Sequence, residues 1–298
     1  MPRYRYRYHR SHYIDPEKLL RRIVVLLLVV IAIAAAFIGT LFVRVEKTDL
    51  RVNGLPDQLR NLRIAYLSDI HRGPWFSQKR VEKLVQQLND FDADLVILGG
   101  DYGTDPEGAI AFFNALPKIK TRQGVYAVVG DTDRSLEDGD LERLLAAMRQ
   151  SGVKGLVNDG EALAFGGATL QIVGLDDYRT GYPDAEAVAR KVHSEDFVIV
   201  AGHSPDLLTT IRDARSADQS GHWYDMALFG HTHGGQINLL GFTPFRKLRS
   251  LAGQRYHQGW LEENRAHILI SNGVGTEYLP LRLFAAPQIH LITLKKGM

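Results

Sequence analysis

The hydrophobic and polar positions of this chain change pattern near residue 60. Residues 23–43 form one apolar run without a charge. In residues 61–298, short apolar runs such as 95–98 alternate with stretches like 77–88, where apolar residues recur at helical spacing. Buried strands and amphipathic helices leave these two patterns in a sequence. The pattern therefore predicts an α/β domain after the apolar run.

Short apolar runs predict the strands of this domain. They are residues 62–67, 95–98, 124–129, 197–200, 226–229, 267–271 and 289–294. Helices are predicted to begin at Ser77, Asp105 and Ser135, because a polar capping residue precedes apolar residues at helical spacing. Asp138 completes a capping-box-like start for the third helix. Residues 153–173 hold short β-like pieces with a Gly166–Gly167 hairpin turn, which predicts a second sheet.

The apolar run is predicted to be a transmembrane anchor. At about 1.5 Å per residue it is just long enough to cross a hydrocarbon core of about 30 Å, and it has no polar face of the kind that a soluble core helix shows. Seven basic residues precede it, while the segment after it has mixed charge. The positive-inside rule then keeps the N-terminus in the cytoplasm. A cleaved signal peptide is the alternative, but the run is long for one and no clean cleavage site follows it.

These features predict a protein of four parts. Residues 1–22 are a basic cytoplasmic arm, 23–43 the anchor, 44–60 a linker and 61–298 the folded domain. We expect a single-pass protein of the cytoplasmic membrane with its domain on the extracytoplasmic side. The interleaved Tyr and Arg of the arm suit contact with anionic lipid, and a solvated basic tail is an equal alternative.

Composition narrows the chemistry. The chain has 298 residues, of which 45% are hydrophobic and 23% charged, as in an ordinary globular protein with a large core. The net charge of +2 provides no strong field for nucleic acid, so no nucleic-acid partner is expected. The absence of cysteine excludes disulfides, zinc-thiolate sites and thiol nucleophiles. The oligomeric state is left open.

The candidate chemistry lies where the apolar strands end. Five strands are followed by clusters of Gly, Asp or His, which read SDIH, GGDYGTD, GDTD, GHSPD and GHTH. In open α/β sheets, ligands gather at the carboxyl ends of strands, so five such clusters can converge on one pocket. One cluster alone is also explained by helix caps and packing histidines. Together they supply seven candidate metal ligands: Asp69, His71, Asp101, Asp131, His203, His231 and His233.

This ligand set predicts two divalent ions. Carboxylate and imidazole without sulfur favour Mn²⁺, Fe or Zn²⁺. Seven ligands exceed the needs of one ion, whereas two ions that share a carboxylate would use them all. Such pairs activate a water and clamp the oxygens of a phosphoryl group. A zinc peptidase is a weaker alternative, because the chain contains no HExxH helix.

The order of these motifs resembles that of the calcineurin-like metallophosphoesterases. GHTHGGQI and the closing NGVGTEYLPLRLF are similar to their membrane-anchored bacterial branch, and the resemblance covers residue 60 to the end. It implies a four-layer α-β-β-α sandwich of two mixed sheets. It also implies one metal held by Asp69, His71, Asp101 and His233, and a second held by Asp101, Asp131, His203 and His231.

The third motif departs from the family pattern. Where the family has Gly-Asn-His-Asp, this chain has Gly130, Asp131, Thr132 and Asp133. Asp131 can still bind a metal, but its negative charge blunts the Lewis acidity of the pair. Thr132 replaces the histidine that in the family assists the leaving group, and a threonine hydroxyl is a poor acid at neutral pH. Asp133 and Arg134 are candidates to orient phosphate, with capping as the simpler explanation for Asp133.

Two hypotheses follow from this departure. The first is a phosphohydrolase for a phosphoanhydride or phosphodiester, because a nucleoside monophosphate leaves a pyrophosphate as a stable anion. Relatives that split UDP-2,3-diacylglucosamine in lipid A synthesis also lack this histidine, which suggests a lipid pyrophosphate by analogy. The second is a catalytically impaired, metal-binding envelope protein.

The expected partner is a phosphorylated lipid or a nucleotide-type substrate, and two surface stretches suit a lipid-bearing one. The aromatic and basic residues of 239–260 and the apolar 279–284 fit a substrate presented at the bilayer, although ordinary surface explains the first stretch as well. The cytoplasmic location of lipid A chemistry conflicts with an extracytoplasmic domain. Of the two, the topology has the stronger support.

Overall fold

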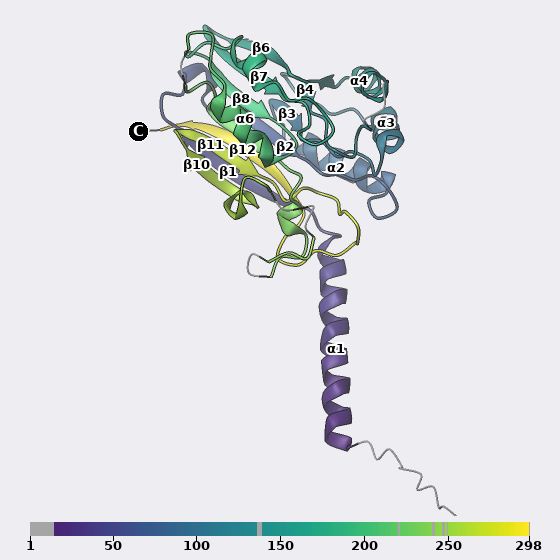
Figure 1. Ribbon diagram of the computed structural model, residues 1–298. Coiled ribbons are helices and arrows are strands. Elements are labelled where there is room, and N and C mark those ends of the chain that lie inside the picture. The colour runs from purple at the N-terminus through teal and green to yellow at the C-terminus, as the bar shows by residue number, and fades with distance from the viewer. Residues whose placement is uncertain are drawn as a thin grey trace, which may run out of the picture.

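A computed structural model describes residues 15–135, 139–219, 221–239, 242–245, 248 and 250–297. One long helix, α1 (Pro16–Gly39), stands apart from a folded α/β domain (Figure 1). Asp15 caps α1 by accepting a hydrogen bond from the Glu17 amide, and Pro16 occupies its first turn. By its length and composition, α1 is able to cross a membrane. The helix starts before the predicted run at 23 and ends before 43.

Two six-stranded mixed sheets form the domain. The first has the strand order β1 (Arg44–Val52), β12 (Gln288–Lys296), β2 (Arg63–Leu67), β3 (Leu95–Leu98), β4 (Val125–Ala127) and β5 (Lys154–Gly155). The second has the order β10 (Gly259–Glu263), β11 (Ala266–Ile270), β9 (Met226–Phe229), β8 (Phe197–Ala201), β7 (Ala168–Gly174) and β6 (Asp159–Phe165). Antiparallel pairs occur in both sheets, at β12–β2 in the first and at β6–β7 and β10–β11 in the second.

Three apolar cores separate four layers. The first sheet is covered by α2 (Gln78–Asp90), α3 (Pro106–Asn114) and α4 (Asp140–Gln150), with Val81, Leu84 and Leu88 of α2 buried against it. A second core fills the space between the sheets. The third lies under α5 (Ala185–Ala189) and α6 (Leu208–Asp213) on the outer face of the second sheet. The predicted sandwich of two mixed sheets is thereby confirmed.

Residues 44–60, which the sequence predicts to be a linker, are part of the fold. Most of this stretch is β1, which pairs in parallel with β12 over nine positions. A turn of 3-10 helix, Asp57–Leu59, follows and buries Leu59. The prediction was wrong because charges alternate along β1, an edge strand with one face in solvent, and only Leu50 and Val52 are buried.

The remaining elements lie close to their predicted positions. Asp105 caps α3 as expected by accepting from the Gly108 amide. The Ser77 side chain precedes α2 without making a capping hydrogen bond, and α4 begins only at Asp140, after Gly139. The proposed cap at Asp138 lies outside the described residues.

Burial of His290 makes the stability of the domain depend on pH. This β12 side chain is 4% exposed, and its Nε2 lies 3.2 Å from the Ser271 hydroxyl. Burial lowers its pKa from 6.5 to about 4. At pH 5 the unfolded chain therefore binds a proton that the native chain does not, and stability is lost as pH falls below 6.5. We expect this one group to remove about 2 kcal/mol between pH 7 and pH 5.

The substitution His290→Gln tests this expectation. Urea unfolding of the full chain in detergent, with a metal chelator present, would be compared at pH 7 and pH 5. The variant should lose less stability than the original chain over this interval, by the amount attributed to His290. An equal loss in both proteins would show that His290 is not the group responsible.

Candidate metal centre

The carboxyl ends of five strands place all seven candidate ligands in one buried region. In the first sheet β2, β3 and β4 run parallel, and in the second β8 and β9 do so, so their ends share one edge of the sandwich. Asp69 and His71 follow β2, Asp101 follows β3, Asp131 follows β4, His203 follows β8, and His231 and His233 follow β9. Six of the seven residues are buried, and Asp131 is the partly exposed member.

One group of ligand atoms surrounds the end of β2. His71 Nε2 and His233 Nε2 lie 3.1 Å apart, and Asp69 Oδ1 lies 3.5 Å from His233 Nε2. The three atoms that these residues offer are all within 4.8 Å of one another. This spacing suits three ligands around one cation.

A second group lies at the ends of β4, β8 and β9. His231 Nδ1 lies 3.1 Å from Asp131 Oδ1 and 3.3 Å from His203 Nε2. His203 Nε2 is 3.2 Å from the same carboxylate oxygen of Asp131. Although burial opposes it, His203 and His231 hold the pKa of Asp131 far below its usual range, so this carboxylate is ionised.

Asp101 lies between the two groups. Its Oδ2 is 3.4 Å from His71 Nε2 on one side and 3.2 Å from His203 Nε2 on the other. Its Oδ1 accepts a hydrogen bond from the backbone amide of Thr132. The side chain is thus oriented so that one oxygen faces both groups, as a carboxylate shared by two cations requires.

The backbone that carries these residues is strained. Positive φ angles between 46° and 66° occur at five of them: Asp69, His71, Asp101, His231 and His233. Residues other than glycine rarely adopt this conformation, and such strain concentrates at functional sites. The flanking glycines allow close approach, since a Cβ on Gly130 would lie 2.2 Å from Asp101 Oδ1 and one on Gly230 would lie 2.4 Å from Asp69 Oδ2.

The donor set fits cations on hydrogen-bonding grounds. His203 Nδ1 lies 2.8 Å from the Gly99 carbonyl, which only accepts, so Nδ1 carries the proton. In the neutral ring, the Nε2 lone pair then faces the carboxylates of Asp101 and Asp131. Burial alone lowers the pKa of His203, but the carboxylates of Asp101 and Asp131 raise it well above its usual value. The Nε2 lone pair and these two carboxylates therefore need a proton or a metal ion between them. His231 also turns its Nδ1 toward Asp131. Its other ring nitrogen, Nε2, is buried and has no hydrogen-bond partner among the described residues.

Comparison with known proteins identifies the family. The profile of the calcineurin-like phosphoesterases matches residues 62–235, which is more than half of the chain and holds all seven residues. The chain belongs to this family. It is 27% identical over 245 residues to the metallophosphoesterase YkuE of Bacillus subtilis, covering 81% of this chain and 82% of that protein.

Two further relatives extend the comparison. A metallophosphoesterase of Aquifex aeolicus is 28% identical over 276 residues, covering 88% of this chain and 95% of that protein. A zebrafish protein named for a transmembrane region and a metallophosphoesterase domain is 26% identical over 266 residues, covering 85% of this chain and 58% of that protein. The protein is a metal-dependent phosphoesterase, and its family typically binds two divalent ions.

The third motif of this phosphoesterase is fixed by hydrogen bonds. The Thr132 hydroxyl donates to the Gly103 carbonyl over 3.2 Å. The fully buried Asp133 accepts from the amides of Gly130, Asp101 and Tyr102, and burial together with the nearby Asp101 charge raises its pKa to about 7. Both Asp133 oxygens are thus used to hold the loops that carry Asp101 and Asp131. Asp133 thus supports the backbone of two ligands, and its role in orienting phosphate stays a prediction.

Two arginines near the centre have different partners. Arg134, a predicted phosphate contact, is paired with buried Asp176 at 3.0 Å. Arg179, which the sequence analysis did not select, places Nη1 3.5 Å from Asp131 Oδ2. The sequence could have predicted this position, because Arg179 follows β7 just as the ligand clusters follow their strands.

A second arginine that the sequence analysis did not select supports the other end of the centre. Arg282, from the closing NGVGTEYLPLRLF stretch, is buried and donates to four backbone carbonyls: those of Asn272, Gly275, Ala285 and His233. Its Nη2 also lies 3.1 Å from His233 Nδ1. Burial, His71 and the Arg282 charge together hold the pKa of His233 well below its usual value. Its ring is therefore neutral, the form that binds metals.

The GHTHGGQI motif and the closing NGVGTEYLPLRLF stretch contact each other directly. Gln236, the glutamine of GHTHGGQI, donates to the carbonyls of Glu277 and Leu279 and accepts from the Glu277 amide. Its side chain thus clamps the closing stretch above the metal centre.

Removal of the Arg282 side chain should destabilise the fold. The substitution Arg282→Ala takes the donor from four buried carbonyls, and hydrogen bonds to charged groups contribute about 1.5–3 kcal/mol each. We expect the free energy of unfolding, measured with urea on the full chain in detergent, to fall by about 3 kcal/mol or more. Arg255→Ala is the control, because this exposed arginine pairs with Glu263 at the surface and should cost less than about 1 kcal/mol. Similar losses in the two variants would contradict the role given to Arg282.

Proposed function

We propose that this phosphoesterase is a membrane-anchored enzyme that uses two divalent ions to hydrolyse phosphoanhydrides or activated phosphodiesters. The observation that carries the proposal is the position of Asp101 Oδ2, between His71 and His203, with a complete ligand group on each side. The replacement of the leaving-group histidine by Thr132 selects among substrates. Membrane anchorage is supported by α1 and by the name of the zebrafish relative.

The proposed ligands divide into two sets with one shared member. Asp69, His71 and His233 would hold the first ion, Asp131, His203 and His231 the second, and Asp101 both. When bound, the ions would supply the Lewis acidity that polarises a phosphoryl group and activates water. The donors suit Mn²⁺, Fe or Zn²⁺, because imidazole and carboxylate ligands are mixed without sulfur.

Arg179 offsets the charge that the third motif adds. An aspartate at 131, where the family has asparagine, makes three carboxylates against two dications. The guanidinium of Arg179 beside Asp131 Oδ2 returns one positive charge to the rim of the centre. Both groups are partly exposed, so Arg179 is also able to contact a phosphate oxygen of the substrate.

The surroundings of Thr132 indicate which class of leaving group the enzyme accepts. Its hydroxyl donates to the Gly103 carbonyl, and its own acidity is too low to protonate an alkoxide near pH 7. A nucleotide or phosphate that leaves a pyrophosphate departs as a stable anion without a proton. Loss of the histidine therefore costs little for a phosphoanhydride and much for an alkyl diester.

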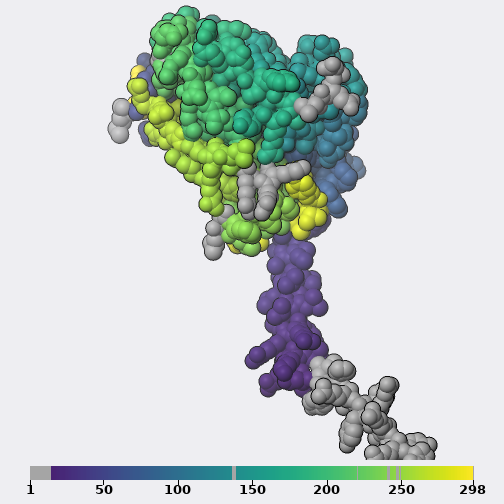
Figure 2. Space-filling view, viewed as in Figure 1, coloured from purple at the N-terminus to yellow at the C-terminus, as the bar shows by residue number. Residues whose placement is uncertain are grey.

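A lipid-bearing pyrophosphate is the proposed substrate class. Exposed apolar side chains of the closing stretch, Leu279 and Phe284, lie in the part of the domain next to α1, since the Arg282 amide between them bonds to the Ala36 carbonyl (Figure 2). A UDP-2,3-diacylglucosamine-type lipid has the required bond. The proposed extracytoplasmic domain favours a lipid pyrophosphate on that side of the membrane. Arg246, Lys247 and Arg249 of the predicted basic loop lie outside the described residues.

Activity of the full chain tests the proposed function. The protein, purified in detergent and loaded with Mn²⁺, is expected to hydrolyse pyrophosphate-linked substrates in a panel of monoesters, diesters, nucleotides and lipid pyrophosphates. Asp101→Asn should reduce turnover by at least about 100-fold and release metal, because it weakens the shared ligand. Asp90→Asn, at the exposed end of α2, is the matched control and should leave both unchanged. Bound metal without turnover of any member would favour the impaired, metal-binding alternative.

A histidine at position 132 should broaden the choice of leaving group. A positioned general acid contributes about 10²–10⁴-fold when the leaving group needs a proton. We expect Thr132→His to raise kcat/KM for an unactivated alkyl diester by at least about tenfold, while the value for a pyrophosphate changes little. Thr132→Asn removes the hydroxyl without adding an acid and serves as the control.

The reverse preference in the original chain would contradict this assignment. Faster cleavage of alkyl diesters than of pyrophosphates would mean that another acid protonates the leaving group. Glu277 is the residue to examine in that case, because burial raises its pKa and its charge interacts with His71 and Asp101. Glu277→Gln would then abolish alkyl diester cleavage selectively.

A further inference from the structure

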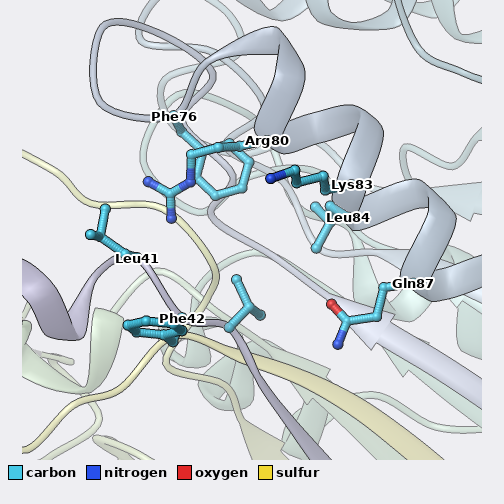
Figure 3. A pocket seen from close by; sticks show the side chains of 8 residues that line it. Leu41, Phe42, Phe76, Arg80, Lys83, Leu84 and Gln87 are labelled. Carbon is cyan, nitrogen blue, oxygen red and sulfur yellow. The ribbon is translucent and has the colours of Figure 1, made fainter.

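A pocket of about 390 Å³ lies at the junction between α1 and the folded domain (Figure 3). One wall is formed by Leu41, Phe42 and Val43, which follow directly after α1 and its final turn. The opposite wall is formed by the first half of α2, with Arg80, Lys83 and Leu84, and Phe76 lies next to it. The pocket is separate from the metal centre, and the proposed hydrolysis uses none of its residues.

The position of the pocket relative to α1 places it at the level of lipid headgroups. The 24 residues of α1 span about 36 Å, which exceeds the hydrocarbon core of about 30 Å. The pocket wall begins two residues after the helix ends at Gly39. Phe42 and Trp75 beside it are 69% and 53% exposed, and aromatic side chains are enriched at this depth of a bilayer.

The charges of the pocket suit a phosphate. The Arg80 guanidinium donates to the carbonyls of Thr40 and Trp75 and lies 4.2 Å from the centre of the Phe76 ring. It is thereby fixed at the upper rim of the pocket, where Figure 3 shows the Lys83 ammonium on the same side. The residues that line the pocket include these two cations and no carboxylate.

Apart from Gln87, the remaining lining is apolar. The wall formed by Leu41, Phe42 and Val43 is one that a free phosphate or a soluble nucleotide would leave in water. A phospholipid uses both parts, because its phosphate is charged and its glycerol and first methylenes are apolar. The pocket offers cations for the phosphate and an apolar wall for the glycerol and first methylenes, as a lipid beside α1 requires.

We propose that this pocket binds an anionic phospholipid from the leaflet next to the domain. Arg80 and Lys83 contact the headgroup phosphate, and Leu41 and Phe42, which are 49% and 69% exposed, contact the glycerol and upper acyl chains. The bound lipid fixes the tilt of the domain on the membrane, because Arg80 also joins α2 to the Thr40 carbonyl at the end of α1. This inference rests on the proposed membrane anchorage, and it is independent of the proposed substrate.

Native mass spectrometry of the full-length protein measures the preference. The protein in detergent is mixed with equal amounts of phosphatidylglycerol and phosphatidylcholine. The measured quantity is the ratio of protein that carries one phosphatidylglycerol to protein that carries one phosphatidylcholine. A cation near a bilayer surface adds about 1 kcal/mol, or about fivefold, to the binding of an anionic lipid. With two cations in the pocket, we expect the original chain to prefer phosphatidylglycerol by about 25-fold.

Variants of α2 decide whether the pocket causes the preference for phosphatidylglycerol. Lys83→Gln should reduce the preference by about fivefold, and Arg80→Gln combined with Lys83→Gln should abolish it. Lys79→Gln is the matched control, because Lys79 is an exposed cation of α2 that does not line the pocket. Lys83→Gln alone leaves the Arg80 hydrogen bonds intact, so it tests the proposal even if the double variant fails to fold.

Each outcome separates the lipid site from the anchorage. Equal binding of the two lipids, or an equal effect of Lys79→Gln and Lys83→Gln, overturns the proposed site. Competition by millimolar glycerol phosphate would show a site for free phosphate and overturn the lipid assignment. Release of the full-length protein from membranes by alkaline carbonate would refute the anchorage itself, whereas retention without lipid preference refutes only the pocket.

Discussion

Seven acceptor atoms packed into one buried region are the constraint on which the rest of the structure depends. His203 donates its only proton in the neutral ring to the Gly99 carbonyl, so its other nitrogen meets two carboxylates that also lack protons. Such a cluster repels itself unless protons or cations lie between its members. The strained backbone at five of the seven residues adds to this cost. The two packed sheets have to supply the stabilisation, and metal ions, once bound, would turn the repulsion into attraction.

The sequence predicts the parts of this fold that depend on local pattern. The strands ending at Leu98 and Phe229 are fully apolar, and the strand ending at Leu67 is buried after its first residue, Arg63. The clusters after these strands share an edge because parallel strands have to align. The first strand could not be predicted in this way, since an edge strand with one solvated face reads as a charged linker. The positive φ angles also leave no pattern, because the residues involved are Asp and His rather than glycine.

Side chains that act through the backbone were the hardest to foresee. Arg282 binds the carbonyl of His233, 49 residues away, and Asp133 binds the amide of Asp101, 32 residues away, so no spacing rule connects them to the ligands. Arg179 differs, since it follows β7 and was accessible to the same rule that found His203 after β8. The ion pair of Arg179 with Asp131 also shows that the unusual third motif is matched by its surroundings. An added charge and its counter-charge occur together.

Arg282 connects the apolar helix α1 to the metal centre. The Arg282 amide donates to the Ala36 carbonyl in the last turns of α1, while its guanidinium lies against the ring of His233. The mechanical path from anchor to metal ligand is therefore a single side chain long, and it is buried throughout. In the proposed membrane-anchored enzyme, a change in bilayer thickness or lateral pressure that tilts α1 would therefore act on the His233 ring through Arg282. The membrane would then be a mechanical component of this enzyme, in addition to the place where it is held.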